Sequence, residues 1–312
     1  MKRIRWAEVR QKVIELIRSS PSYRFPTVRS VYYYLGSLGV IPLTEYGYKK
    51  LDALTVEMRK NNEIPWGYFT VKRGESGYLG AKYISPENYL GFHIKRLKEC
   101  WENYEIPIWY RQPVHVEVWI EKKGLLPTIE HWLTELDVKV RSGEGYAAWE
   151  FVWQSCEDIK SYLEDRTDDE VWIYYLGDLD PSGIDITRHV KEAVEFFKIN
   201  LKFERLALNP EQVKKYNLPL WPERMEVIEK LEKDPRRKWY FQKYGRIACE
   251  LDAFVALAPE HLQKIVVEAV KKHLNQKIKE ERDELNEKAK QKLKEKLEKM
   301  KIQFEGESLE NS

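Results

Sequence analysis

The feature that most constrains the fold of this chain is an alternation of short apolar runs and helical patterns that begins at residue 114. Four strand-like runs lie in this region: Val114–Ile120, Val138–Arg141, Val171–Leu176 and Phe203–Leu208. Three amphipathic helical segments separate them: 125–136, 147–164 and 183–197. Because strands that alternate with helices in this way pair side by side in one direction, the pattern predicts an α/β domain built on a parallel sheet.

The residues before this region carry a different pattern, that of three short helices. Apolar residues recur at helical spacing over 3–18, a second helix begins near Thr27, and a third covers 46–60. The strand-like stretch Tyr68–Val71 then follows, where a small β-wing would lie. Three helices and a wing describe a winged helix-turn-helix, which is a fold that binds DNA.

These patterns predict four parts of the chain. We expect a winged helix-turn-helix domain over 1–85, a connecting segment over 86–112, an α/β domain over 113–275 and a charged helical tail over 276–312. The apolar positions of the tail do not keep a strict heptad, so it is predicted as a solvated helix, with a pairing arm as the alternative.

Composition bounds the setting of the chain. Its 53 Lys and Arg residues against 51 Asp and Glu give a net charge of only +2, so composition by itself predicts no polyanionic partner. The three cysteines form no C-x-x-C pair, which argues against a structural zinc site and a disulfide framework. No run of about 18 apolar residues occurs, so neither export nor membrane insertion is indicated. We expect a soluble cytoplasmic protein.

Three carboxylates follow two of the strand-like runs. Glu121 comes directly after the first run, and Asp178 and Asp180 follow the third, between Gly177 and Gly183. Ligands of open α/β sheets bind outside the carboxyl ends of the strands, so these side chains would meet in one crevice. Such hard oxygen ligands suit Mg²⁺, with Mn²⁺ as a substitute. For any one of them, a helix cap or a salt bridge is the alternative.

A run of three tyrosines lies in the second helix, whose expected apolar stripe consists of Val28, Val31, Leu35 and Leu38. At about 100° per residue, Tyr33 falls opposite this stripe, whereas Tyr32 and Tyr34 lie at its borders. Tyr33 is therefore predicted to face solvent. Arg29 shares its face and would hold a phosphate beside an attacking hydroxyl. The alternative is an ordinary recognition helix, in which Arg29 contacts phosphate and the tyrosines pack or stack.

Both elements resemble motifs of one family. The segment Val118–Lys122 with Gly177–Gly183 is similar to the Glu and D-x-D motifs of Toprim domains, in a form close to the A subunit of topoisomerase VI and its meiotic break-forming relatives. The string Thr27–Tyr34 is similar to the T-x-R-x-x-Y-Y element of that family, in which the second tyrosine attacks DNA. A third tyrosine follows here, so Tyr32 and Tyr34 stay open as alternatives to Tyr33. Gly143–Tyr146 matches a Gly-Tyr motif, but Ala147 replaces the usual Pro.

The resemblance implies a Rossmann-like Toprim domain and an isomerase-type DNA transesterase that forms a 5′-phosphotyrosyl link through Tyr33. It implies Asp178 as the main Mg²⁺ ligand with Asp180 in support, Glu121 as a ligand or a general acid or base, and Arg29 as a transition-state clamp. It also implies a homodimer on double-stranded DNA, in which one subunit lends the tyrosine and the other the metal.

Two features separate the chain from a complete topoisomerase. No Walker A motif occurs, so ATP-driven strand passage would need a separate ATPase subunit. The chain is shorter than a typical A subunit, and its segments 64–66 and 250–253 resemble stand-alone Toprim proteins of archaea, bacteria and mobile elements. A Toprim nuclease with water as the attacker and a non-catalytic DNA-binding protein are the alternatives.

Overall fold

The computed structural model describes residues 4–21, 24, 25, 27–69, 85–143, 149–163, 170–196, 201–220 and 234–305 of the chain. The chain divides into two compact units, of which one comprises 1–73 with 113–273 and the other 74–112 with 274–312. The four parts expected from the sequence remain predictions. Over the described ranges, no helix is both long and apolar enough to cross a membrane.

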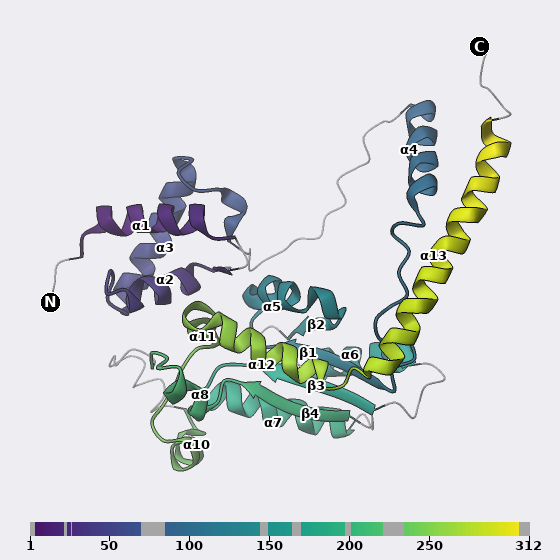
Figure 1. The fold of residues 1–312 in the computed structure, drawn as a ribbon. Helices are drawn as coiled ribbons and strands as arrows, with labels where there is room; N and C mark the ends of the chain where they lie inside the picture. The colour runs from purple at the N-terminus through teal and green to yellow at the C-terminus, as the bar shows by residue number, and fades with distance from the viewer. Residues whose placement is uncertain are drawn as a thin grey trace. The chain divides into compact units, whose positions relative to one another are not determined.

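The first unit is built around a four-stranded, all-parallel sheet, as the sequence predicts (Figure 1). Its strands are β1 (Val114–Ile120), β2 (Lys139–Ser142), β3 (Glu170–Leu176) and β4 (Leu201–Ala207). Their order across the sheet is β2-β1-β3-β4. From β1 the chain continues to β2 at one edge of the sheet, and from β3 it continues to β4 at the opposite edge. The carboxyl ends of β1 and β3 therefore flank a topological switch point, where ligands of such sheets bind.

Helices cover both faces of this sheet (Figure 1). On one face, α6 (Trp149–Leu163) and α7 (Pro181–Phe196) share a core with the strands, in which Val152, Ile173 and Val190 are fully buried. On the other face, α5 (Leu126–Leu133) contacts β2, and α12 (Pro259–Lys271) contacts β4. Single 3-10 turns at Lys123–Leu125 and Thr134–Leu136 flank α5. This arrangement leaves the carboxyl edge of the strands to the loops.

Three N-terminal helices occur where the sequence predicts them: α1 (Trp6–Ser19), α2 (Val28–Ser37) and α3 (Glu45–Lys60). Thr27 caps α2, since its side chain accepts a hydrogen bond from the Ser30 amide at 3.1 Å. Thr44 caps α3 in the same way through the amide of Gly47.

The prediction of a β-wing at Tyr68–Val71 is wrong for its first two residues. Trp66–Tyr68 forms a 3-10 turn and Phe69 is not in a strand, while 70 and 71 lie outside the described residues. Tyr68 is buried, and its hydroxyl donates to the carbonyl oxygens of Ser20 and Pro21 at 3.2 and 3.3 Å. Docking of this side chain beyond the end of α1 thus replaces the strand pairing that its residue type favours.

Three shorter helices of the first unit complete the described chain around the sheet: α8 (Pro210–Lys215), α10 (Arg237–Tyr244) and α11 (Leu251–Leu257). The second unit contains α4 (Pro86–Glu99) and the single helix α13 (Gln276–Glu305), which confirms the helical tail. Asn286 of α13 accepts a hydrogen bond from the amide of Ile106 at 2.8 Å. None of the residues of α4 is buried, and Tyr89 and Phe92 are exposed on it.

A buried ionic network links β1, β2 and α6 in the first unit. Glu117 of β1 is only 1% exposed and accepts hydrogen bonds from Arg141 at 2.7 and 3.0 Å and from the Trp119 indole at 2.7 Å. Arg141 also pairs with Asp158 of α6 at 2.7 Å. Burial opposes ionisation of Glu117, but hydrogen bonds from His115, Arg141 and Trp119 hold its pKa below the usual range. The buried Glu117 side chain therefore needs Arg141 to stay ionised.

Arg141→Met is expected to lower the free energy of unfolding by about 3–5 kcal/mol, because it leaves the buried Glu117 charge without its cation. Removing both charges in Glu117→Gln/Arg141→Met should recover most of this loss. Urea unfolding of the two variants measures the difference. A double variant as unstable as the single one would contradict this account of the network.

Candidate functional site

The carboxyl ends of β1 and β3 bring two of the expected residues into contact. The amide of Glu121 continues the sheet by donating to the Leu176 carbonyl at 2.9 Å. The Glu121 carboxylate in turn accepts a hydrogen bond from the Asp178 amide at 2.9 Å. Glu121 and the loop after β3 are thus joined at the switch point, where the sequence places both.

Asp180 has a local structural role in the same loop. Its Oδ1 accepts a hydrogen bond from the Gly183 amide at 2.5 Å, which caps the first turn of α7. Arg205 of β4 holds the loop from the other side by donating to the carbonyl oxygens of Gly177 at 2.8 Å and Asp178 at 2.5 Å. The helix cap weighed as an alternative for Asp180 is therefore present, alongside its place among the carboxylates.

Neither Gly177 nor Gly183 has a positive φ, so backbone conformation does not require glycine at these positions. Glycine is required there because other groups approach closely. A Cβ at Gly177 would lie 2.7 Å from the Tyr175 ring and 2.8 Å from Glu121 Oε2. A Cβ at Gly183 would collide with the carbonyl oxygen of Asp178 and lie 3.2 Å from Glu121 Oε2. The glycines therefore allow the tight approach of Glu121 to the loop.

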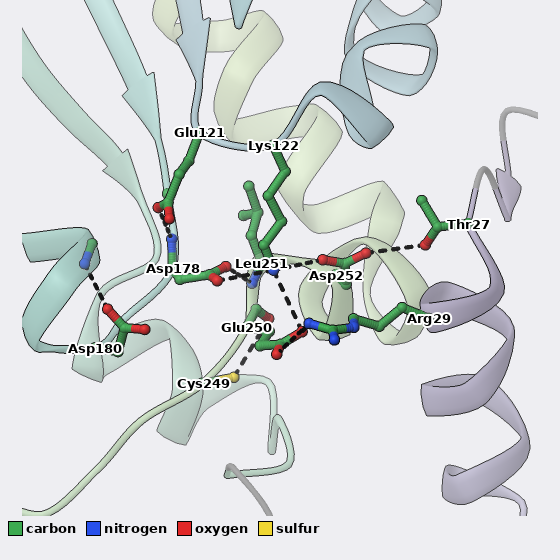
Figure 2. Close-up of polar contacts among 12 residues, drawn as sticks. Thr27, Arg29, Glu121, Lys122, Asp178, Asp180, Cys249, Glu250, Leu251 and Asp252 are labelled. Carbon is green, nitrogen blue, oxygen red and sulfur yellow. Dashed lines mark hydrogen bonds and ion pairs between the residues drawn. The ribbon is translucent and has the colours of Figure 1, made fainter. Parts of the chain in front are cut away.

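A distant segment adds two more carboxylates. Leu179 and Cys249 form an isolated antiparallel bridge, in which each amide nitrogen lies 2.9 Å from the carbonyl oxygen of the other residue. This bridge brings Glu250 and Asp252, at the start of α11, beside the loop after β3. The amide of Leu251 donates to Asp178 Oδ1 at 2.8 Å. Figure 2 shows these carboxylates gathered around one lysine side chain.

That lysine is Lys122, which directly follows Glu121. Its Nζ lies 2.9 Å from Asp178 Oδ2, 2.8 Å from Asp252 Oδ2 and 3.4 Å from Glu250 Oε2 (Figure 2). Burial would lower the pKa of this amine, but the charges of the three carboxylates raise it well above its usual value. Lys122 is therefore a permanent cation at the centre of the site.

Helix α2 reaches the same cluster from the N-terminal part of the chain. Thr27 donates to Asp252 Oδ1 at 3.1 Å, and Arg29 donates to both oxygens of Glu250 at 2.6 and 2.7 Å (Figure 2). Arg29 was expected to hold a phosphate, but its guanidinium is bound to Glu250 and lies over the Tyr48 ring at 5.1 Å.

The prediction that Tyr33 faces solvent is wrong. Tyr33 is 4% exposed, whereas Leu38, assigned to the buried stripe, is 53% exposed. The physical reason is that α2 contacts α1 and α3 as well as α11, so packing covers more than one of its faces. Burial raises the pKa of the Tyr33 phenol, Glu250 raises it further, and Arg29 and Lys122 partly oppose them. Tyr33 is thus within electrostatic reach of the carboxylate cluster.

The site holds more negative than positive charge. Its carboxylates are Glu121, Asp178, Asp180, Glu250 and Asp252, and its cations are Arg29, Lys122 and Arg205. Burial raises the pKa of Glu121 to about 7, and Asp178 adds to this effect. Burial also raises the pKa of Asp178, Asp180 and Glu250, whereas Lys122 helps to hold that of Asp252 below its usual value. Burial and mutual repulsion therefore favour uptake of a proton or a cation.

In the part of the chain that the structure describes, no group of three or more His, Cys, Asp or Glu side chains is already arranged to hold a metal ion. The ammonium of Lys122 lies between three of the five carboxylates. Of the Gly-Tyr segment 143–146 expected nearby, Gly143 donates its amide to the Ile120 carbonyl at 3.3 Å, and 144–146 lie outside the described residues.

Sequence reasoning missed four residues of this site: Lys122, Arg205, Glu250 and Asp252. The segment containing Glu250 and Asp252 was noticed only as a family-like string, and no spacing connects it with Asp178. Lys122 lies beside a predicted ligand, but a lysine at a strand end has many surface roles. Comparisons of the chain with models of protein families, with curated proteins and with solved structures found no match.

The raised pKa of Glu121 gives a pH-dependent stability. Between about pH 4.5 and 7 the folded chain keeps a proton on Glu121 that the unfolded chain releases, so stability is lost as the pH rises through this window. In Glu121→Gln the part of this loss that comes from Glu121 disappears, and the variant should gain roughly 1–3 kcal/mol over wild type across the window. Urea unfolding in a chelator at several pH values measures the gain. Parallel profiles for the two proteins would contradict it.

Gly183→Ala is expected to destabilise the chain by about 1–3 kcal/mol, because the new Cβ meets the Asp178 backbone and nothing flexible can yield. Gly91→Ala is the matched control, since a Cβ at Gly91 in α4 meets nothing within 4 Å. Better helix propensity should make that variant more stable, by up to about 1 kcal/mol. Thermal unfolding compares the two signs, and equal effects would refute the close approach at Gly183.

Proposed function

We propose that this chain is a DNA transesterase, in which Tyr33 attacks a phosphodiester of double-stranded DNA beside a Mg²⁺ site at the carboxyl ends of β1 and β3. One observation carries the proposal: α2, which bears Tyr33 and Arg29, joins the carboxylate cluster at the topological switch point through Arg29–Glu250 and Thr27–Asp252. Two motifs distant in the sequence thus converge on one charged site.

The support for a divalent cation comes from carboxylate oxygens that the described hydrogen bonds leave without a donor. Within the described network, Glu121 uses Oε2 and Asp180 uses Oδ1 for hydrogen bonds to backbone amides, which leaves one oxygen of each for a cation. The Tyr175 hydroxyl is buried and has no hydrogen-bond partner among the described residues. The Tyr175 ring and Glu121 Oε2 both lie within 3 Å of the position that a Cβ of Gly177 would take. Glu121, Asp178 and Asp180 would hold Mg²⁺, which neutralises the phosphate and stabilises the leaving oxygen.

The chain's own residues supply the remaining steps. The Tyr33 oxygen forms a bond to phosphorus, and the bond from phosphorus to the 3′ oxygen breaks, which leaves a 5′-phosphotyrosyl link and a free 3′ hydroxyl. Glu250, whose charge raises the pKa of the Tyr33 phenol, accepts the phenolic proton. Glu121, with a pKa of about 7, donates a proton to the leaving 3′ oxygen. Arg29 then stabilises the charge of the transition state.

Attack requires that Tyr33 become accessible to DNA. Its ring is buried where α2 packs, and Arg29–Glu250 and Thr27–Asp252 hold the helix there. Separation of α2 from α11 would release both Tyr33 and Arg29. A homodimer in which each chain lends its tyrosine to the carboxylates of the other would achieve this, and would cleave both strands.

The family and the partners belong to the same proposal. The Glu121 and D-x-D motifs support a Toprim domain of the topoisomerase VI A type, and the three N-terminal helices support a helix-turn-helix domain for duplex DNA. ATP-driven strand passage would require a separate ATPase subunit. We place the protein in the cytoplasm.

Burial of Tyr33 favours one second candidate, a metal-dependent nuclease in which water replaces the phenol. The carboxylates would have the same roles, and the product would carry no protein. The two candidates differ in the fate of the 5′ phosphate.

The deciding experiment incubates supercoiled plasmid with the protein and Mg²⁺, stops the reaction with SDS, and compares samples with and without protease. We expect linear DNA bound covalently to protein for wild type, and no adduct for Tyr33→Phe or Asp178→Asn. Tyr34→Phe is the matched control and should keep the adduct. Cleavage without any adduct would establish the nuclease, and loss of the adduct only in Tyr34→Phe would move the nucleophile to Tyr34.

A further inference from the structure

The position of Lys122 divides the carboxylate cluster into two halves. One half consists of Asp178, Glu250 and Asp252, whose oxygens surround the Lys122 ammonium at 2.8–3.4 Å. The other half consists of Glu121 and Asp180, whose described hydrogen bonds come from backbone amides. The two halves meet at Asp178. Its Oδ2 binds Lys122, and its amide donates a hydrogen bond to the Glu121 carboxylate.

The first half is already satisfied as a cation site. An ammonium has three N–H donors and here faces three carboxylates that come from two separate chain segments. Arg29 adds a second positive charge on Glu250 at 2.6 Å. This half therefore carries three negative and two positive charges, and its oxygens converge on a cation that the chain itself supplies.

The second half lacks such a cation. Lys122 and Arg205 both act on the charge of Asp180, but the Lys122 ammonium binds the first half. The guanidinium of Arg205 donates to carbonyl oxygens and a hydroxyl, those of Gly177, Asp178, Gly183, Leu208 and Thr187. Glu121 and Asp180 thus keep carboxylate oxygens that no ammonium or guanidinium binds in the described structure. In the described structure, the carboxylates without a bound side-chain cation therefore lie in this half alone.

Lys122 is also fixed in place by its backbone. Its neighbour Glu121 forms the last sheet hydrogen bond with Leu176 at 2.9 Å. The Lys122 carbonyl accepts a hydrogen bond from the Leu125 amide at 3.0 Å, which closes the 3-10 turn before α5. The side chain therefore starts from a rigid point and reaches directly into the carboxylates.

We propose that Lys122 is a tethered cation that takes the place of a second divalent ion, so that the site accepts one external metal ion instead of two. Phosphodiester-cleaving sites commonly use two metal ions about 3.5–4 Å apart, each balanced by carboxylates. Here the ammonium balances Asp178, Glu250 and Asp252, and Glu121, Asp178 and Asp180 take the single ion. This inference rests on the proposed Mg²⁺ site for its consequence, but its test does not use DNA cleavage.

The test counts Mn²⁺ ions bound to the full chain at neutral pH, by electron paramagnetic resonance of the free ion during titration. Lys122→Met removes the ammonium and keeps the length of the side chain. It should bind one Mn²⁺ more per chain than wild type. Lys122→Arg, which keeps the charge, and Lys214→Met, which removes an exposed lysine of α8, should both bind the wild-type number.

Two further measurements keep the result decisive. In Lys122→Met/Asp252→Asn one of the carboxylates left without the lysine is neutralised, and the count should return to that of wild type. If Lys122→Met does not fold in a chelator, Mn²⁺ should restore its thermal unfolding transition, and failure to do so would overturn the proposal. An unchanged count in folded Lys122→Met would overturn it as well.

The outcomes separate this proposal from the proposed function. One ion in wild type and one in Lys122→Met would refute the tethered cation and leave the Mg²⁺ site intact. No ion in wild type and one in Lys122→Met would refute the Mg²⁺ site at Glu121, Asp178 and Asp180, while the role of Lys122 as a substitute cation would stand.

Discussion

The site depends on the Asp178 side chain and backbone, which together connect three parts of the first unit. Its amide donates to Glu121 after β1, its Oδ1 accepts from Leu251 at the start of α11, and its Oδ2 binds Lys122. Its carbonyl oxygen is held by Arg205 of β4. A buried carboxylate is stable only when such donors and cations surround it. The backbone and the carboxylate of one residue therefore hold the loops at this edge of the sheet together.

The strand ends were predictable because two local signals agree there. β1 and β3 are apolar runs bounded by Glu121 and by Gly177, and alternation with helices predicts their parallel pairing. Once the strands are parallel, their carboxyl ends share an edge, so contact of Glu121 with the Asp178 loop follows from topology. Thr27 was likewise predicted near the start of α2, which it caps with its side chain.

The remainder of the site was not predictable from local patterns, because it depends on tertiary contacts. Glu250 and Asp252 arrive through the Leu179–Cys249 bridge, and nothing in the spacing of these residues indicates a two-residue pairing. The exposure of Tyr33 was predicted from one apolar stripe, which assumes that a helix buries a single face. Contact of α2 with α11 as well as α1 and α3 breaks that assumption. Apolar periodicity cannot reveal the ion pair by which Arg29 binds a second partner, Glu250.

The same contacts couple the position of α2 to the charge of the site. Glu250 binds Arg29 of α2 and Lys122 of the cluster, so its negative charge is shared between docking of the helix and balance of the carboxylates. Mg²⁺ on Asp178 would leave more of the Lys122 charge to Glu250, which weakens the hold of Glu250 on Arg29. Conversely, release of Arg29 lets Glu250 take more of the Lys122 charge, which frees Asp178 for the ion. Linkage requires the two effects to be equal in free energy. Under the proposed function, binding of Mg²⁺ and exposure of Tyr33 are therefore expected to favour each other through Glu250.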